Sequence, residues 1–408
     1  MSFHVINEAR RCLQCGKPLC QLKGCPVNTA VPEMIRLFLA GKPAEAGQLL
    51  FENNPLSVFC SLVCDHEAQC EGHCVLGIKG SSVQISSIEN YISDAYLDRA
   101  IISREEPNGQ SVAVIGAGPA GLTLAMKLAQ RGYSVTIFER KSYIGGMLRY
   151  GIPDFRLPKS ILQRYEKKMQ QLGVNIRRHM TIGGTLNMDD LFNDGYGAVV
   201  IASGVWRPNR LNVRGESLGN VHYAVNYLQK PEVFDLGERV AVIGAGNSAM
   251  DTARTIIRRG SRFVDVYARR MAIAASQREI DYALADGVNI HYGLGISELT
   301  PQGPMLYENY FDEAGKITGH GEPRLYPADS TIIAVSQGPK NKIVSGTTGI
   351  ETEETGLVKV DGSGRTTREG VFSCGDVVMG AKTVVHAVKQ AKQVAEAVDD
   401  YLRAKRTE

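Results

Sequence analysis

Eight of the nine cysteines lie in the first 74 residues, where they form two tight groups. The first group is Cys12, Cys15, Cys20 and Cys25, and the second is Cys60, Cys64, Cys70 and Cys74. So many thiols in a short segment indicate bound metal or iron–sulfur centres. The alternative is a pair of four-cysteine zinc sites, but the gaps on either side of Cys20 suit paired zinc knuckles poorly. The spacing therefore favours iron–sulfur chemistry.

A glycine-rich loop follows an apolar segment and precedes a helical pattern. The loop is Gly116, Ala117, Gly118, Pro119, Ala120 and Gly121. In dinucleotide-binding folds such glycines allow a tight turn, close approach of a pyrophosphate and close packing of helix on strand. Glu139 ends the next apolar segment, where a carboxylate accepts hydrogen bonds from a ribose, and Arg140 follows it. The pattern predicts a dinucleotide site.

Six further residues are expected to complete this site for a flavin. They are Gly145, Gly146, Gly375, Asp376, Thr383 and Val384. The paired glycines would let a loop pass close to the cofactor. Asp376 ends a short apolar segment, where it can bind a ribityl hydroxyl or, alternatively, cap a helix. A helix starting near Thr383 can direct its N-terminus at the N1–C2=O edge of a flavin and stabilise the reduced ring.

A second glycine-rich loop predicts a second nucleotide site. It is Gly244, Ala245, Gly246, Asn247, Ser248 and Ala249, with alanine at the third glycine position. The next apolar segment ends in Arg269 and Arg270 rather than in an acid. A guanidinium binds a 2′-phosphate through charge-assisted hydrogen bonds, whereas a carboxylate would repel it. The site is therefore expected to prefer NADPH to NADH, unless the arginines are only a solvated edge.

The elements that must position these residues belong to two types. The cysteine-rich part shows helical spacing, with Pro32 and Pro43 in first-turn positions. The strand–loop–helix–strand unit then occurs twice, which predicts an α/β protein with two Rossmann-like domains. Apolar segments return near the C-terminus, so we expect the second of these domains to be inserted in the first. The expected limits are 1–105 for the helical domain, 106–230 and 335–408 for the first nucleotide domain, and 231–334 for the insert.

Composition excludes several classes of function. The 408 residues carry a formal net charge of +3, which is too small to indicate nucleic-acid binding. No apolar run approaches the ~18 residues that a membrane span needs, and the first residues contain no apolar segment of a signal peptide. The cysteines are therefore expected in a reducing, cytoplasmic environment, where metal binding is favoured over disulfides.

Taken together, the motifs resemble a known family of oxidoreductases. It comprises the small subunit of bacterial glutamate synthase, the N-terminal part of dihydropyrimidine dehydrogenase and the NADPH-binding subunits of some flavin-based transhydrogenases. The resemblance covers nearly the whole chain. Its most specific pieces are CLQCGKPLC with GCP, CDHEAQCEGHCVLG, GAGPAG with GG, GIPDFRLPK at 151–159, GAGNSAMD, and GVFSCGD with KTVVHAV. It implies a helical domain with two [4Fe–4S] clusters, an FAD domain and an NAD(P)H domain, with the GIPDFRLPK loop and its Arg156 near the flavin.

The resemblance also implies two sets of cluster ligands. One set is Cys12, Cys15, Cys20 and Cys74, and the other is Cys25, Cys64, Cys70 and Glu89. Glu89 falls where relatives place a glutamine or glutamate ligand. Counting cysteines alone would select Cys60 as the eighth ligand, and Cys60 remains the alternative. If Glu89 is the ligand, Cys60 and Cys374 are ordinary buried thiols.

The function that the resemblance implies is electron input. Hydride would pass from NADPH to FAD, and single electrons would leave through the clusters to a larger catalytic or electron-accepting partner, because no segment remains for a second substrate domain. The partner could belong to a glutamate synthase, a pyrimidine-reducing enzyme or a transhydrogenase linked to ferredoxin and NADH. A redox sensor and a zinc-stapled nucleotide-binding module are the alternatives outside catalysis. No general acid is expected, and His386 is assigned to helix packing.

Overall fold

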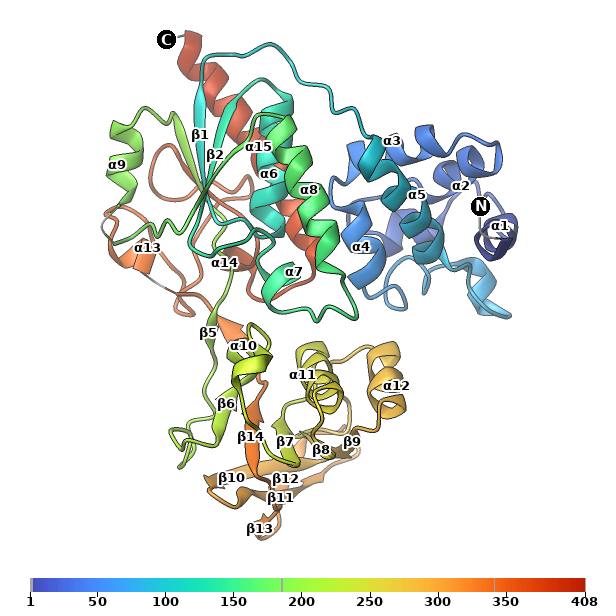
Figure 1. The fold of residues 1–408 in the computed structure, drawn as a ribbon, viewed down its shortest axis with the longest axis vertical. Helices are drawn as coiled ribbons and strands as arrows, with labels where there is room; N and C mark the ends of the chain where they lie inside the picture. Colours follow the sequence, from blue (N-terminus) through green and yellow to red (C-terminus); the bar gives the residue numbers. More distant parts are fainter. Residues whose placement is uncertain (1–2, 185, 341, 408) are drawn as a thin grey trace. The chain divides into compact units, whose positions relative to one another are not determined.

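The computed structural model describes residues 3–184, 186–340 and 342–407. The chain divides into two compact units, and Figure 1 shows the course of the chain through them. Unit 1 contains Met1–Arg149, Asp154–Val205 and Gly338–Glu408, and unit 2 contains Tyr150–Pro153 and Trp206–Gln337. Unit 1 is therefore built from segments that lie on both sides of unit 2 in the sequence.

The N-terminal part of unit 1 is helical, as the sequence predicts. Its α-helices are α1 (Phe3–Arg10), α2 (Val31–Leu39), α3 (Pro43–Asn53), α4 (Ser57–Val63) and α5 (Ile85–Arg99), with a π-helical turn η1 (Cys20–Gly24) and a 3₁₀ turn η2 (Val75–Ile78). Helices α2 and α3 each carry proline in the first turn, where no intrahelical N–H is needed. Met34, Ile35 and Phe38 bury one face of α2, which packs these helices around a common apolar core.

The rest of unit 1 is a five-stranded parallel sheet with helices around it. The strands are β1 (Ser111–Ile115), β2 (Ser134–Glu139), β3 (Asn175–Arg178), β4 (Ala198–Ile201) and β16 (Val371–Ser373), in the order β16-β4-β1-β2-β3. The helices are α6 (Pro119–Gln130), α7 (Met147–Tyr150), α8 (Lys159–Gln171), α9 (Met188–Asn193), α13 (Lys342–Ser345), α14 (Asp376–Met379) and α15 (Val384–Thr407). Because β16 comes from the C-terminal part of the chain, the sheet needs segments that lie on both sides of unit 2 in the sequence.

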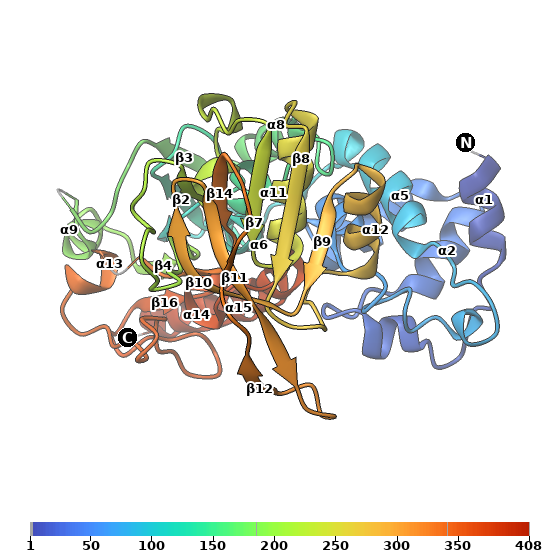
Figure 2. The ribbon, with the colours of Figure 1, turned by 90° about the horizontal axis from the view of Figure 1, so that it is seen from below.

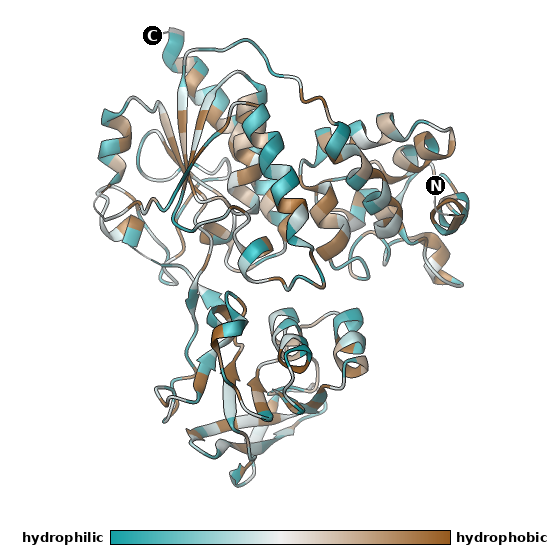
Figure 3. Ribbon diagram, viewed as in Figure 1, coloured by the Kyte–Doolittle hydropathy of each residue, from teal (hydrophilic) through white to brown (hydrophobic). Residues whose placement is uncertain are grey.

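Burial explains the regular pattern of this sheet. Strands covered on both faces read as continuous apolar runs, and Val112, Val114 and Ile115 of β1 are all buried. Helix α8 shows the other pattern, with Ile161, Leu162, Tyr165 and Met169 buried along one stripe. Figure 3 shows this helix as mainly teal, with brown segments along it.

Unit 2 contains a second five-stranded parallel sheet. Its strands are β6 (Val221–Tyr223), β7 (Arg239–Ile243), β8 (Phe263–Ala268), β9 (Asn289–Tyr292) and β14 (Ser330–Ile333), in the order β6-β14-β7-β8-β9. The helices are α10 (Ala224–Tyr227), α11 (Asn247–Arg258) and α12 (Gln277–Ala285), with a 3₁₀ turn η3 (Pro231–Val233). Figure 2 shows β14, β7 and β8 next to one another, in agreement with their pairing.

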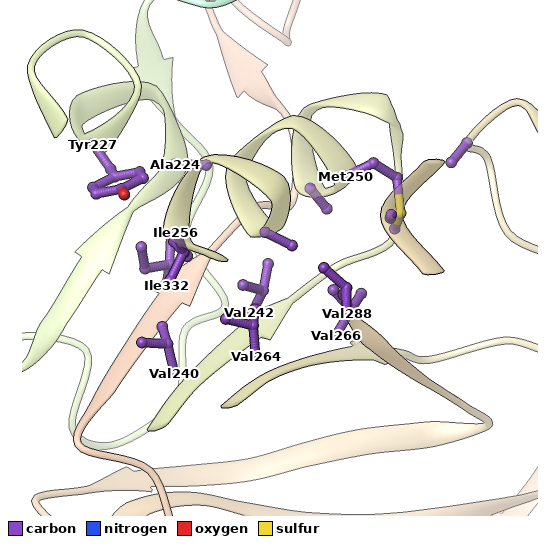
Figure 4. Close-up of a cluster of buried hydrophobic side chains, with 14 of the residues drawn as sticks. Ala224, Tyr227, Val240, Val242, Met250, Ile256, Val264, Val266, Val288 and Ile332 are labelled. Atoms are coloured by element: carbon purple, nitrogen blue, oxygen red, sulfur yellow. The ribbon is translucent and has the colours of Figure 1, made fainter. Parts of the chain in front are cut away.

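The core of unit 2 lies between this sheet and α11. Val240, Val242, Val264 and Val266 project from β7 and β8 toward Met250 and Ile256 of the helix, as Figure 4 shows. Unit 2 also has an antiparallel sheet that the sequence analysis does not predict. It consists of β10 (Leu294–Thr300), β11 (Gly303–Phe311), β12 (Ile317–His320) and β13 (Arg324–Leu325). The short strands β5 (Arg207–Pro208) and β15 (Gln337–Gly338) complete the secondary structure.

The predicted fold class is confirmed: a helical N-terminal part is followed by two parallel sheets of Rossmann type. Within the described ranges, none of the helices combines the length and the apolar character that crossing a membrane requires.

Candidate redox and nucleotide-binding sites

Four cysteines from two separate segments line one cavity in the helical part. They are Cys12, Cys15, Cys20 and Cys74, and the remaining walls include apolar residues of α2 and of the start of α5. Burial raises the pKa of Cys20 to about 11, and it also raises the pKa of Cys12. Burial thus disfavours the thiolate forms of Cys12 and Cys20, and a bound cation would offset that cost. Four cysteines around one space are a donor set that fits an iron–sulfur cluster.

A second group forms around the buried Glu89 of α5. Cys25, Cys64 and Cys70 all lie within electrostatic reach of its carboxyl group. Burial raises the pKa of Glu89 to about 8. Its carboxyl makes no hydrogen bond or ion pair with any described residue, and a buried carboxylate without a partner is unfavourable. A positively charged iron centre held by Glu89 and the three cysteines would remove that penalty, so the donor set fits a cluster here too.

Cys60 lies beside this second group. It is buried one turn before Cys64, whose backbone N–H donates to the Cys60 carbonyl over 3.0 Å. A hydrogen bond with Cys60, followed by burial, raises the pKa of Cys64. The structure therefore brings both candidates for the eighth ligand close to the same cysteines. Cys374 is fully buried in unit 1, and burial raises its pKa to about 12.

In residues 3–184, 186–340 and 342–407, no three Cys, His, Asp or Glu side chains converge in a way that would hold a single metal ion. Cysteines that hold an iron–sulfur cluster bind different iron atoms, so they need not converge on one point.

The first glycine loop joins β1 to α6, and its backbone packs closely against neighbouring backbone. A Cβ atom on Gly121 would lie 2.0 Å from the carbonyl oxygen of Gly116, so only glycine fits there. Gly146 has φ +54, and a Cβ atom on it would lie 2.8 Å from the Cα of Gly118. The N–H of Gly145 donates to the carbonyl of Ala117 over 2.7 Å. The structure thus brings the two glycine segments of the predicted flavin site into contact.

Glu139 ends β2 next to this loop. One carboxylate oxygen accepts from the N–H of Ala117 and the other accepts from the N–H of Lys141, both over 2.8 Å. The buried side chain therefore fixes the loop, and each oxygen still has capacity to accept another hydrogen bond. Arg140, the next residue, is exposed, and Arg156 is partly buried in the segment before α8.

The C-terminal residues of the predicted flavin site also belong to unit 1. The N–H of Gly375 donates to Oε1 of Gln390 over 2.7 Å, and a Cβ atom on Gly375 would lie 2.8 Å from the Cβ of Ala120 in α6. Burial raises the pKa of Asp376 to about 6. Thr383 precedes α15, which begins at Val384, and its Oγ1 lies 2.7 Å from Nδ1 of His386. His386 therefore packs on the start of its own helix.

The second glycine loop joins β7 to α11 in unit 2. Asn247 Oδ1 accepts from the N–H of Ser276 over 2.9 Å, which fixes the start of the helix. The buried Ser248 Oγ has no hydrogen-bond partner among the described residues, and a Cβ atom on Gly246 would meet nothing within 4 Å. A helix N-terminus that carries an unpartnered hydroxyl, after a glycine with open space around it, fits a phosphate ligand. Ala249 is buried in the first turn of α11.

Arg269 and Arg270 follow β8 and are both exposed. Neither guanidinium forms an ion pair with a described carboxylate, whereas Arg254 and Arg258 of α11 both pair with Asp286. The backbone carbonyl of Arg269 accepts from Asn309 Nδ2 over 3.0 Å, which holds the end of the strand. Two cationic side chains are thus available at the end of β8.

Some residues of unit 1 act through long-range contacts that a sequence does not reveal. Gln390 and Lys392 of α15 bond to residues far away in the chain, and no local pattern marks either of them.

A pyridine nucleotide-disulphide oxidoreductase family model matches residues 96–391, and a model described as dihydropyrimidine dehydrogenase domain II, 4Fe–4S cluster, matches residues 2–101. The chain therefore belongs to the pyridine nucleotide-disulphide oxidoreductase family and carries a 4Fe–4S-type domain before it. The glutamate synthase [NADPH] small chain of Halomonas elongata is 33% identical over 97% of this chain and 90% of its own length. The predicted family resemblance is confirmed.

Two further proteins extend the comparison. The beta subunit of the NADP(+)-dependent formate dehydrogenase of Moorella thermoacetica is 32% identical over 94% of this chain and 60% of its own length. The structure of Mycobacterium tuberculosis FprA in complex with NADPH matches with a TM-score of 0.62 and 18% identity, over 74% of this chain and 86% of that chain. The latter likeness shows the fold of the nucleotide-binding part. Together with the family membership, these matches identify the chain as an oxidoreductase.

Proposed function

We propose that this chain is the electron-input subunit of a larger enzyme, similar to a glutamate synthase small subunit. It transfers hydride from NADPH to FAD and passes single electrons through two [4Fe–4S] clusters to a partner subunit. The observation that carries this proposal is that two separate groups of candidate ligands, one around a shared cavity and one around Glu89, belong to the same compact unit as the first glycine loop. The relatives' names, a glutamate synthase small chain and a formate dehydrogenase beta subunit, support the role of a subunit.

The proposed binding roles follow the geometry of each group. Cys12, Cys15, Cys20 and Cys74 hold one cluster, and Cys25, Cys64, Cys70 and Glu89 hold the other. In the proposed domain limits, both groups fall in residues 1–105, FAD is bound by 106–230 with 335–408, and NADPH is bound by 231–334. Bound FAD accepts an electron pair from a nicotinamide, while bound clusters carry one electron at a time.

The chain's own residues bind and orient these groups. The N–H groups at the start of α6 would bind the FAD pyrophosphate, and Glu139 would accept from the ribose while it holds the loop. Asp376 would bind the ribityl chain, and the positive end of α15 would stabilise the reduced flavin ring. In unit 2, Ser248 would donate to a phosphate of NADPH, and Arg269 and Arg270 would bind its 2′-phosphate.

Anaerobic purification of the protein with its native partner tests this proposal. We expect FAD, iron and acid-labile sulfide in the isolated material, rapid bleaching of the flavin by NADPH, and then reduced-cluster signals in electron paramagnetic resonance. Zinc in place of iron and sulfide would refute the cluster assignment and favour the zinc-stapled module. Intact cofactors that NADPH fails to reduce would favour a redox sensor.

A second candidate keeps the same site but changes the partner. The 32% identity to a formate dehydrogenase beta subunit favours a complex that reduces NADP(+) with electrons from another oxidoreductase. A transhydrogenase linked to ferredoxin and NADH would likewise exchange electrons between this site and another oxidoreductase. A pyrimidine-reducing enzyme is the third option. Mass spectrometry of the co-purified partner distinguishes these complexes.

Gly118→Ala and Gly246→Ala are expected to separate the two nucleotide sites. Both glycines have ordinary φ angles, −81° and −95°. An added Cβ atom would meet only the Gly146 Cα at 3.9 Å in the first case and nothing within 4 Å in the second. Both variants should therefore fold, but the methyl group occupies the space that the pyrophosphate approaches.

We expect Gly118→Ala to lose FAD and Gly246→Ala to keep FAD while kcat/KM for NADPH falls about tenfold or more, equivalent to ~1.4 kcal/mol. Flavin absorbance, thermal unfolding and steady-state kinetics measure these effects, and each variant is the control for the other. Full FAD content in Gly118→Ala would contradict the assignment of the first loop.

A further inference from the structure

A chain of hydrogen bonds connects helix α15 with Cys25. The ammonium group of Lys392 donates to the backbone carbonyl of Asn53 over 2.7 Å and to its Oδ1 over 2.9 Å. Asn53 Nδ2 donates to Thr29 Oγ1 over 3.3 Å, and Thr29 Oγ1 lies 3.2 Å from the Cys25 sulfur. Three side chains thus join the C-terminal helix of unit 1 to a proposed cluster ligand.

The direction of these hydrogen bonds is fixed by the cation at one end. An ammonium group can only donate, so it binds the amide oxygen of Asn53 and leaves the amide nitrogen to face Thr29. The Thr29 hydroxyl accepts from that nitrogen, and its own proton is free to be donated. When Cys25 is a thiolate, the only role left for its sulfur is acceptor. Every donor in the chain then points from Lys392 toward the sulfur.

Burial strengthens the electrostatic effect of these hydrogen bonds on the Cys25 sulfur. Thr29 is only 6% exposed, and Asn53 and Lys392 are partly buried. Burial lowers the pKa of Lys392, while the charge of Cys25 opposes that shift by favouring the ammonium. Charges and hydrogen bonds act more strongly in such surroundings than in water.

Helix α15 also begins at the proposed flavin site. Lys392 follows Val384 by eight positions, which corresponds to about 12 Å along an α-helix at 1.5 Å per residue. The same rigid element therefore presents its N-terminus at one proposed cofactor and a cation near the ligand of another.

We propose that Lys392, Asn53 and Thr29 form a relay that raises the reduction potential of the cluster held by Cys25. Positive charge and hydrogen bonds to ligand sulfur stabilise the reduced cluster, which carries one more negative charge. The relay adds no chemical step, because it changes only the equilibrium of the one-electron transfer from flavin to cluster. This inference rests on the proposed cluster at Cys25, Cys64, Cys70 and Glu89.

Redox titration of the anaerobic holoprotein, followed by electron paramagnetic resonance, tests the relay. Lys392→Met removes the charge, and Thr29→Val removes only the hydroxyl beside the sulfur. We expect each to lower the reduction equilibrium constant of one cluster by about tenfold or more, which is 59 mV for a one-electron couple. The second cluster, held by the other four cysteines, is the internal reference and should keep its potential.

Three control variants distinguish an effect on the reduction potential from a loss of side-chain packing. Lys392→Arg and Thr29→Ser keep the charge and the hydroxyl and should restore the potential. Lys127→Met removes another ammonium near the end of α3, where Lys127 Nζ donates to the Glu52 carbonyl over 2.7 Å. Because Lys127 has no place in the hydrogen-bonded relay, this variant should shift the potential much less than Lys392→Met does. The double variant Thr29→Val with Lys392→Met should shift the potential by less than the sum of the two single shifts, because both substitutions break the same series of hydrogen bonds.

The outcomes distinguish this inference from the proposed function. Both clusters present with potentials unchanged in Thr29→Val and Lys392→Met would overturn the relay and leave the proposed function standing. If Lys392→Met fails to retain the cluster, the test depends on Thr29→Val alone. An unchanged reduction potential in Thr29→Val would then overturn the relay. Native protein without iron and sulfide would overturn the proposed function itself.

Discussion

Replacing Arg269 by glutamate is expected to lower kcat/KM for NADPH by about 10- to 100-fold, because each hydrogen bond to a charged group contributes about 1.5–3 kcal/mol. The new carboxylate also repels a 2′-phosphate. NADH has a hydroxyl in that position, so its kcat/KM should stay within about threefold or rise. The ratio of the two kcat/KM values, measured with an artificial electron acceptor, gives the result directly.

Arg262→Glu provides the matched control for this experiment. The Arg262→Glu substitution changes the charge by the same amount as Arg269→Glu. Arg262 lies just before β8, whereas Arg269 lies just after it, at the carboxyl end of the strand, where nucleotides bind in parallel sheets. The control should affect NADPH and NADH equally and weakly. An equal loss with both nucleotides in Arg269→Glu would remove the assignment of NADPH to this site.

The second large effect is expected for Glu89. Glu89→Ala should remove one of the two proposed clusters, and with it about half of the iron and acid-labile sulfide, because the fourth protein ligand is lost. Cys60→Ala should leave both clusters in place. Iron and sulfide analysis together with electron paramagnetic resonance of the reduced protein measures both variants.

The apoprotein supplies a second readout for Glu89. Because burial raises the pKa of this carboxyl to about 8 in the folded state, folding favours its protonated form. The contribution of the protonated carboxyl to stability is present below the ordinary pKa and is lost as the pH rises toward 8. Glu89→Ala should therefore weaken this pH dependence in the apoprotein, while Cys60→Ala preserves it. Loss of a cluster in Cys60→Ala and not in Glu89→Ala would assign the eighth ligand to Cys60.

The local part of the fold follows from the sequence. Strand, glycine loop and helix are contiguous in each nucleotide-binding unit, so β1 with α6 and β7 with α11 can be recognised from apolar runs and glycine spacing. The prolines of α2 and α3 mark helix starts that the structure contains, because this signal also depends only on neighbouring residues. The parallel order of the two sheets follows from the repeated crossover.

Contacts between distant segments could not be predicted in this way. Glu139 is expected from its position to face a ribose, but its bonds to Ala117 and Lys141 depend on how the loop folds back. The partners Asn53 and Lys392 are 339 positions apart, so no periodicity relates them. Strand β11 alternates buried and exposed residues only in part, and its pairing with β10 is irregular near Glu298, which hides the antiparallel sheet from pattern analysis.

The place of β16 in the first sheet has a consequence for biosynthesis. Val371 pairs beside Val199 of β4, although the ribosome makes the two strands 172 residues apart. A chain emerging from the ribosome can form the helical part and four of the five strands early, but β4 has no partner on one side until Val371–Ser373 has been synthesised. Until then β4 presents an unpaired edge, which is a template for pairing with the wrong chain.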